Sequence, residues 1–138
     1  MIRVFLDSDV ILDFLLKRGP FAEPAGMIFS LGERSKLSLL TSTLSFMNVH
    51  YIAATATNQS TARTLAQRLR TLLELLPVSA DHVDAAFASG LKDVEDYIQY
   101  AVAREGHVDY LVTRNTDDYP REPSFILSPV VFLDTLPE

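Results

Sequence analysis

The chain has 138 residues and a formal net charge of −6, with 48% hydrophobic and 22% charged residues. These values suit one globular domain spanning residues 1–138, with enough apolar residues for a buried core. The sequence contains no cysteine, which excludes disulfides, thiolate metal sites and a cysteine nucleophile. No apolar run approaches the roughly 20 residues of a membrane helix, and MIRVFLDSDV is too short before its first acid for a signal peptide. We therefore expect a cytoplasmic protein without membrane association.

The first half of the chain alternates short apolar runs with stretches of helical periodicity. Continuous apolar runs predict buried strands, and apolar residues at spacings of three and four predict helices. The predicted elements are, in order, a strand over 2–6, helices over 10–15 and about 23–31, a strand over 37–40, and a helix capped by Ser42 that continues through Ile52.

The second half repeats this alternation. Its clearest helix follows Asn58, which is a favoured capping residue, and carries leucine and alanine at helical spacing. Strands that alternate with helices predict an α/β fold, namely a three-layer α/β/α sandwich around a parallel central sheet of four to five strands. The remaining predicted elements are a brief strand over 76–78, helices from Ser79 to Gly90 and from Val94 to Gly106, strands over 110–113 and 124–127, and a short helical turn over 131–136.

Polar residues follow several of the predicted strands. Ligands of parallel α/β sheets bind at the carboxyl ends of the strands. Asp7 follows the first strand, Asp118 follows the strand over 110–113, and Asp96 lies in the first turn of the helix that starts at Val94. We expect these three acids to converge on one rim of the sheet.

The negative net charge does not indicate a basic surface for nucleic acid, because Lys and Arg make the phosphate contacts that dominate such binding. Either nucleic acid is not the ligand, or the acids hold cations that contact its phosphates. Three or four carboxylate oxygens bind Mg²⁺ or Mn²⁺, and such an ion activates water and polarises a phosphoryl oxygen. The joint placement of the acids favours a Mg²⁺ or Mn²⁺ site.

Each acid also has a purely structural explanation. Asp7 and Asp93 can cap the helices that follow them, because aspartate is a preferred N-cap residue. Asp117 and Asp118 lie in a loop, where aspartate is common. The case for a metal site therefore depends on the acids being brought together and not on any one of them.

Other polar residues are expected to have no role in the site. Asp9 and Asp13 are predicted to face solvent or to cap a helix, because acids are favoured in a first helical turn. His50, His82 and His107 show no metal-binding spacing, so each is expected to be structural or exposed.

Three segments resemble motifs of the PIN-domain family and occur in the family's order. FLDSDVILDFLLKRGPF is similar to its opening strand and acid, KDVEDYIQYAVA to the segment with its central acid, and DYLVTRNTDDY to its closing motif. With the helices between them, the resemblance covers essentially the whole chain. It implies a PIN-like sheet and a VapC-like toxin ribonuclease that cleaves RNA with Mg²⁺ or Mn²⁺.

Carried onto the matching positions, the resemblance implies a set of site residues. The implied metal ligands are Asp7, Asp96, Asp118, Asn115 and Asp93, and the acids at 7, 96 and 118 would be catalytic. The residues expected to support these ligands are Ser8, Asn48 and Thr113. Arg114 and Lys17 are our candidates for contact with the RNA backbone.

One position departs from the family pattern. Members usually place a Glu six residues after a Ser, in the helix after the second strand, whereas this chain has Asn48 six residues after Ser42. Asn can coordinate a hard cation through its carbonyl oxygen but brings no charge. The chain resembles a subgroup with Asn at this place, in which Asp93 would restore the missing charge. We expect the departure to affect activity more than fold.

Two other functions are open at this stage. With Asn48 and Asn115 in place of acids, the fold could bind RNA or a partner protein without cutting. LDSDVIL also resembles the opening of haloacid-dehalogenase-like phosphatases, with Asp7 as nucleophile and Asp9 as acid–base, although that family has a longer chain with a cap. If the chain is a toxin ribonuclease, RNA would be its substrate, an antitoxin protein its partner, and a homodimer its expected assembly.

Overall fold

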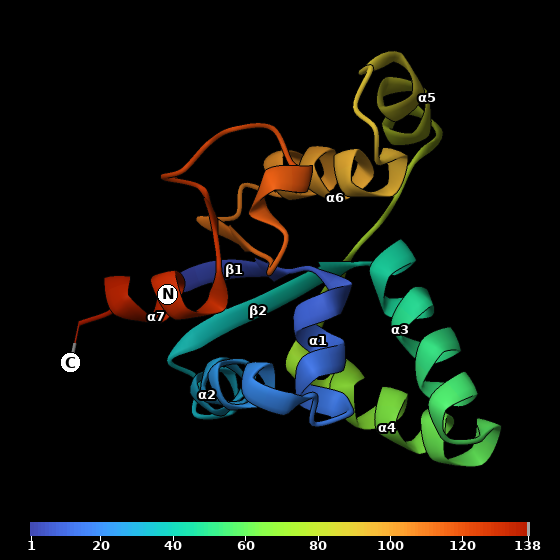
Figure 1. Cartoon of the computed structure of the whole chain (residues 1–138), viewed down its shortest axis with the longest axis vertical. Coiled ribbons are helices and arrows are strands. Elements are labelled where there is room, and N and C mark those ends of the chain that lie inside the picture. Colours follow the sequence, from blue (N-terminus) through green and yellow to red (C-terminus); the bar gives the residue numbers. More distant parts are fainter. Residues whose placement is uncertain (138) are drawn as a thin grey trace.

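The computed structural model describes residues 1–137, and its centre is a five-stranded sheet in which all neighbouring strands run parallel (Figure 1). The strands lie in the order β3-β2-β1-β4-β5. Their bounds are β1 Ile2–Leu6, β2 Leu37–Ser42, β3 Leu73–Leu76, β4 Tyr110–Val112 and β5 Ile126–Leu127. The predicted α/β fold with a parallel sheet is confirmed. The first strand lies at the centre of the sheet, so the residue after it is flanked by neighbouring strands.

Helices cover both faces of the sheet. They are α1 Ser8–Leu15, α2 Ala22–Glu33, α3 Thr43–Ala56, α4 Gln59–Leu72, α5 Ala80–Ala88, α6 Val94–Glu105 and α7 Pro129–Thr135, with short 3-10 helices η1 Gly19–Phe21 and η2 Thr116–Asp118. One buried cluster joins α1, α2, α3, α4 and α7 to one face, and a second joins α5 and α6 to the other. Val4 and Leu6 belong to the first cluster and Phe5 to the second, as strand alternation requires. No helix within residues 1–137 is long and apolar enough to cross a membrane.

Polar side chains mark the starts of most helices. The residues that accept a hydrogen bond from a first-turn backbone N–H are Asp7, Ser42, Asn58, Ser79, Asp93 and Ser128. Such bonds satisfy donors that the first helical turn leaves free. The predicted caps at 42, 58 and 79 are confirmed. Helices α1 and α3 both start at the carboxyl edge of the sheet, which brings their first turns to the same rim (Figure 1).

Several predicted boundaries differ from the structure. Strand β3 starts three residues earlier than predicted, because Leu73 pairs with Leu39 of β2 and is buried there. Leucines at this place also fit the apolar stripe of α4, so the sequence pattern alone does not separate helix from strand. Strand β5 is two residues long, shorter than the predicted strand. Helix α7 begins at Pro129, because Ser128 caps it and proline is favoured in a first helical turn.

Candidate metal centre at the carboxyl edge of the sheet

Asp7 lies directly after β1 and is held in one orientation by three neighbours. Its Oδ1 accepts a hydrogen bond from the Ser8 backbone N–H at 2.7 Å, which caps α1. Its Oδ2 accepts from Thr113 Oγ1 at 2.9 Å and from the Tyr119 hydroxyl at 2.8 Å. Asp7 is 6% exposed, so the carboxylate is fixed at the edge of the core. Asp7 therefore caps α1 and also lies where the sequence predicts a metal ligand, so the two interpretations of this residue do not exclude each other.

Tyr119 is a site residue to which the sequence assigned no role. It is buried between the sheet edge and the second core cluster. Burial, followed by the charge of Asp7, raises the pKa of the Tyr119 phenol well above its ordinary value. The hydroxyl therefore stays protonated and donates to the carboxylate at neutral pH. An aromatic residue after the acids of DYLVTRNTDDY was the available signal, but nothing in the pattern indicated its direction.

Asp9 is half-buried and turned toward the loop after β4, and it neither faces solvent fully nor caps the helix, which corrects the sequence-based prediction. Its Oδ2 accepts from the Arg114 backbone N–H at 3.2 Å and from Asn115 Nδ2 at 2.9 Å, and lies 3.4 Å from Thr113 Oγ1. Its Oδ1 is buried and has no hydrogen-bond partner among the described residues. Burial, followed by the charge of Asp7, raises the pKa of Asp9 to about 7. The rotation of α1 turns this first-turn residue toward the loop after β4.

Asp13 is also buried, which corrects the second prediction of a solvent-facing or capping acid. It is 1% exposed and lies one helical turn after Asp9, so the two share a face of α1. Arg114 donates to both Asp13 oxygens, from Nε at 2.6 Å and from Nη2 at 3.1 Å. Arg18 lies further away, at 4.0 Å. Arg114 thus compensates the charge of the buried Asp13 carboxylate through two hydrogen bonds. Because Arg114 lies about a hundred residues away in the sequence, local patterns could not show this pairing.

The two candidates for RNA contact lie in different surroundings. The guanidinium of Arg114 is held by Asp13 and stacks over the Phe21 ring at 4.0 Å from the ring centroid. Lys17 is exposed and follows the end of α1, whereas Asp7 precedes its start. One length of this eight-residue helix, about 12 Å, therefore separates Lys17 from the acids. The structure does not bring Lys17 to the site.

Asp96 lies where several negative charges act together. Burial and the charges of Asp7, Asp93 and Asp118, in that order, raise the pKa of Asp96 to about 8. Asp93 caps α6, and its Oδ1 accepts from the Asp96 backbone N–H at 3.0 Å. Asp7 and Asp118, the other two acids predicted to be catalytic, therefore lie near enough to Asp96 for their charges to raise its pKa.

The loop after β4 carries the remaining predicted ligands. The Asn115 backbone N–H donates to Thr113 Oγ1 at 3.1 Å, and its side-chain amide reaches Asp9. Asp118 is exposed at the end of η2. The bonds from Thr113 and Asn115 tie this loop to the start of α1 and so bring the closing acids to the opening acid.

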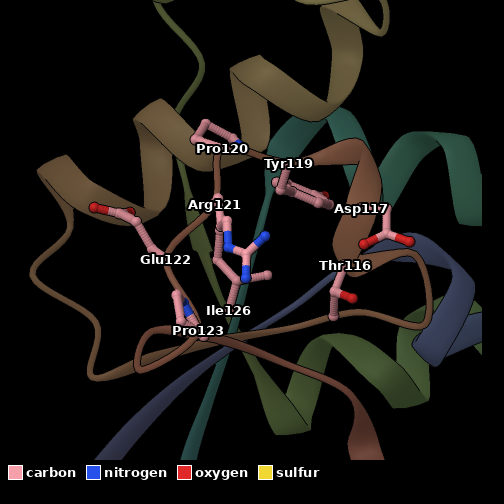
Figure 2. Close-up of a pocket in the computed structure, with 8 residues that line it drawn as sticks. All are labelled: Thr116, Asp117, Tyr119, Pro120, Arg121, Glu122, Pro123 and Ile126. Carbon is pink, nitrogen blue, oxygen red and sulfur yellow. The ribbon is translucent and has the colours of Figure 1, made fainter.

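Two surface hollows adjoin η2. Figure 2 shows the first, with its residues drawn as sticks; they are Thr116, Asp117, Tyr119, Pro120, Arg121, Glu122, Pro123 and Ile126. The second is lined by Leu91, Lys92, Asp93, Val94, Glu95, Asp117 and Asp118. Both hollows include Asp117; the first also includes Tyr119, and the second includes Asp93 and Asp118. Solvent-accessible space therefore lies beside two of the predicted ligands, Asp93 and Asp118.

The end of β2 contacts α6 close to the site. Ser42 Oγ donates to the buried Gln99 Oε1 at 2.5 Å, and Gln99 follows Asp96 by one helical turn. This bond connects the end of β2 to the helix that presents Asp96. Asn48 lies half-buried on α3, and no hydrogen bond within residues 1–137 connects it to the acids.

The donor chemistry at this edge of the sheet fits a divalent cation. Carboxylate and amide oxygens are the ligands that Mg²⁺ and Mn²⁺ prefer, and the buried Asp9 Oδ1 lacks any partner in the described part of the chain. Within residues 1–137, no three His, Asp or Glu side chains are close enough together to hold one ion.

Solved structures similar in fold to this chain include toxins and toxin–antitoxin complexes. DNA-bound VapBC from Salmonella typhimurium aligns with a TM-score of 0.69 at 16% identity, covering 93% of this chain and 98% of that one. A toxin–antitoxin complex from Klebsiella pneumoniae aligns at 0.66 and 21%, covering 91% and 97%. Mycobacterium tuberculosis VapC20, a sarcin–ricin-loop-cleaving toxin, aligns at 0.64 and 16%, covering 78% and 86%. At these identities the likeness shows the fold.

The sequence itself identifies the family. No curated protein sequence matches the chain significantly. A family model described as PIN domain matches residues 3–117, which include the opening strand, the acid of α6 and the start of the closing loop. The match covers most of the chain and agrees with the parallel fold and with the resemblance of the three motifs. The chain belongs to the PIN-domain family.

Proposed function

We propose that this PIN-domain protein is a metal-dependent endoribonuclease that hydrolyses RNA phosphodiester bonds. One observation carries the proposal: Asp7 and Asp118 lie near enough to Asp96 for their charges to help raise the Asp96 pKa to about 8. A divalent cation would relieve this crowding. It would also make an acidic rim attractive to a phosphodiester, which resolves the conflict with the net charge of −6.

Each residue of the site has a distinct part in the proposal. Bound Mg²⁺ or Mn²⁺ would supply an activated water and neutralise charge on the phosphate. Its proposed ligands are Asp7, Asp96 and Asp118, with Asn115 and Asp93 as further oxygen donors. Thr113 and Tyr119 orient the Asp7 carboxylate through Oδ2, while Oδ1 accepts the Ser8 backbone N–H at 2.7 Å and the Ser8 hydroxyl at 3.4 Å. Ser8 and Asn48 would support the ligands at the rim.

Contacts to the RNA backbone are proposed along the hollows beside η2. Lys92 lines one hollow and Arg121 the other, and both side chains are exposed. They are better placed for phosphate contact than Arg114, which Asp13 engages, or Lys17, which lies at the far end of α1. These two positively charged side chains, on either side of the acidic centre, suit an RNA strand that crosses the proposed metal site.

The similar structures support a toxin with a protein partner. VapBC assemblies from Salmonella typhimurium and Rickettsia felis are described as bound to DNA, and the Klebsiella pneumoniae structure is a toxin–antitoxin complex. We propose that this chain acts in the cytoplasm as the toxin of such a pair, held inactive by an antitoxin protein. Met47, Tyr51 and Ile52 are exposed on α3 and offer an apolar face for the proposed homodimer.

The second candidate is a binding module that does not cut. The open spacing of the acids within residues 1–137 and the uncharged Asn48 favour it. It predicts weak or absent Mn²⁺ binding, so calorimetric titration of the purified protein with Mn²⁺ separates the two candidates. The phosphatase alternative has no support from the PIN-domain match.

Comparison of wild type with Asp7→Asn tests the nuclease. Asn can keep a carbonyl oxygen on the Ser8 N–H while its amide donates to the Thr113 and Tyr119 hydroxyls, but it removes the charge, so the fold should survive and Mn²⁺-dependent RNA cleavage should fall by roughly 100-fold or more. Asp84→Asn makes the same chemical change at an exposed acid of α5, outside both hollows, and serves as the matched control with near wild-type cleavage. Full retention of cleavage by Asp7→Asn would show that the site is elsewhere.

A further inference from the structure

Asp9 has two carboxylate oxygens in very different surroundings. Its Oδ2 is bound by the Arg114 backbone N–H and by the Asn115 side-chain amide and lies within reach of the Thr113 hydroxyl. Its Oδ1 is buried and has no hydrogen-bond partner within residues 1–137. A buried carboxylate oxygen without a partner is unfavourable, and native structures usually avoid it. Asp9 Oδ1 therefore lacks a partner among the described residues, and a bound ligand could supply one.

The donors on Oδ2 fix the direction of Oδ1. They come from three consecutive residues of the loop after β4, so the carboxylate cannot turn without breaking contacts to that loop. Thr113 Oγ1 also contacts Asp7 Oδ2, so the same hydroxyl bridges the two acids. Asp9 is thus held beside a proposed ligand, and its free oxygen is restrained in place.

The nearest guanidinium does not satisfy Asp9. Arg114 gives Asp9 only its backbone N–H, while its Nε and Nη2 both donate to Asp13. The side-chain charge of Arg114 is therefore committed to a different carboxylate. A small hard cation is the partner that suits a restrained, unpaired carboxylate oxygen beside a second carboxylate.

We propose that Asp9 binds the divalent ion directly through Oδ1, together with Asp7. This inference rests on the proposed metal dependence of the nuclease. It adds a carboxylate from the first turn of α1 to the site, a residue that the sequence placed outside it.

The test is Mn²⁺ binding without RNA, measured by isothermal titration calorimetry and by the electron paramagnetic resonance signal of free Mn²⁺. The proteins are wild type, Asp9→Asn and the control Glu95→Gln, an exposed acid adjacent to Asp96 whose change also removes one charge. Asp9→Ser is a second variant, and circular dichroism and thermal unfolding establish that each protein is folded.

The proposal predicts that Mn²⁺ affinity falls roughly tenfold or more in Asp9→Asn and Asp9→Ser and less than about threefold in Glu95→Gln. Wild-type affinity in a folded Asp9 variant would overturn the role of Asp9 and leave the proposed nuclease standing. An equal loss in Glu95→Gln would also overturn it, because the effect would then be long-range charge and not ligation. Absence of Mn²⁺ binding by the wild type would overturn both the inference and the metal dependence on which it rests.

Discussion

Arg114 makes a different contact with each part of its structure. Its backbone N–H holds Asp9, its guanidinium pairs with the buried Asp13, and the face of the guanidinium stacks on Phe21. A fully buried carboxylate is tolerated only when a partner compensates its charge, and Arg can do this through two parallel bonds. The residue therefore acts as a structural clamp between α1 and the loop that carries the closing acids.

Removal of this clamp is expected to be costly. Arg114→Ala leaves Asp13 buried without its close partner, so we predict a loss of about 3 kcal/mol in the free energy of unfolding. Arg18→Ala is the matched control, because Arg18 is partly exposed and lies 4.0 Å from the same carboxylate; its loss should be under about 1 kcal/mol. Urea unfolding of the three proteins measures both values. Equal, small losses would mean that the ion pair does not hold the loop.

Asp93 combines a possible ligand with a helix cap, and two substitutions separate these parts. Asp93→Ala removes the oxygen that accepts from the Asp96 backbone N–H and should cost about 1 kcal/mol of stability. Asp93→Ser keeps a capping oxygen and should cost less than half as much. Thermal unfolding in EDTA gives the comparison without metal. The capping role is wrong if the serine variant is as unstable as the alanine variant.

At the scale of elements, helix α2 contains two glycines in opposite environments. A Cβ added at Gly32 would collide with the buried side chain of Leu39 on β2. A Cβ added at Gly26 would meet nothing closer than Phe14 at 4.0 Å. The first glycine therefore allows the helix to approach the sheet closely, whereas the second only lowers helix propensity.

The two glycines predict opposite effects of the same substitution. Gly32→Ala should destabilise the protein by about 1–3 kcal/mol through overpacking, and Gly26→Ala should stabilise it by up to about 1 kcal/mol. Chemical denaturation of both variants against wild type provides the measurement. If both substitutions stabilise, then α2 does not pack against β2 as closely as the structure has it.

Most elements could be predicted from local patterns, because capping residues and apolar periodicity are properties of neighbouring residues. Ser42, Asn58 and Ser79 were predicted as caps and are caps in the structure. The boundary between α4 and β3 could not be placed, because Leu73 satisfies a helical stripe and a buried strand equally well. The pairing of Leu73 with Leu39 of β2 makes it a strand residue, and these two residues lie far apart in the sequence.

At the scale of the whole molecule, the order of strands explains why part of the site was predictable. The carboxyl ends of parallel strands lie at one edge of the sheet, and Asp7 and Asp118 were expected there for that reason. The structure adds that β1 and β4 are neighbours. Asp9 and Tyr119 were not predicted as site residues. Their directions depend on the rotation of α1 and on the path of the loop after β4, and local patterns fix neither of these.

The crowded acids also predict how the stability of the metal-free protein varies with pH. The pKa of Asp9 is raised from 3.8 to about 7 and that of Asp96 from 3.8 to about 8. The folded state thus keeps protons that the unfolded chain releases, so these groups make stability fall as pH rises from about 4 to about 8. Asp96→Asn removes one such group.

The difference between two proteins isolates this effect. In EDTA, the free energy of unfolding of Asp96→Asn minus that of wild type should be larger at about pH 8 than at about pH 5. The wild type loses stability over this range because it must ionise Asp96, and the variant does not. Urea unfolding at the two pH values measures the change. A difference that stays constant or reverses would show that Asp96 is not crowded by the other acids.

The central claim is that the acids at the carboxyl edge of the sheet form a metal-dependent ribonuclease site. The most direct measurement is cleavage of a mixed RNA pool by wild type and Asp96→Asn, each with Mn²⁺ or Mg²⁺ and each with EDTA, after both proteins are shown to be folded. The account predicts that wild type cleaves RNA with metal, that EDTA abolishes cleavage, and that Asp96→Asn does not cleave. Cleavage that survives in EDTA or in Asp96→Asn, or no cleavage by a folded wild type, would contradict it.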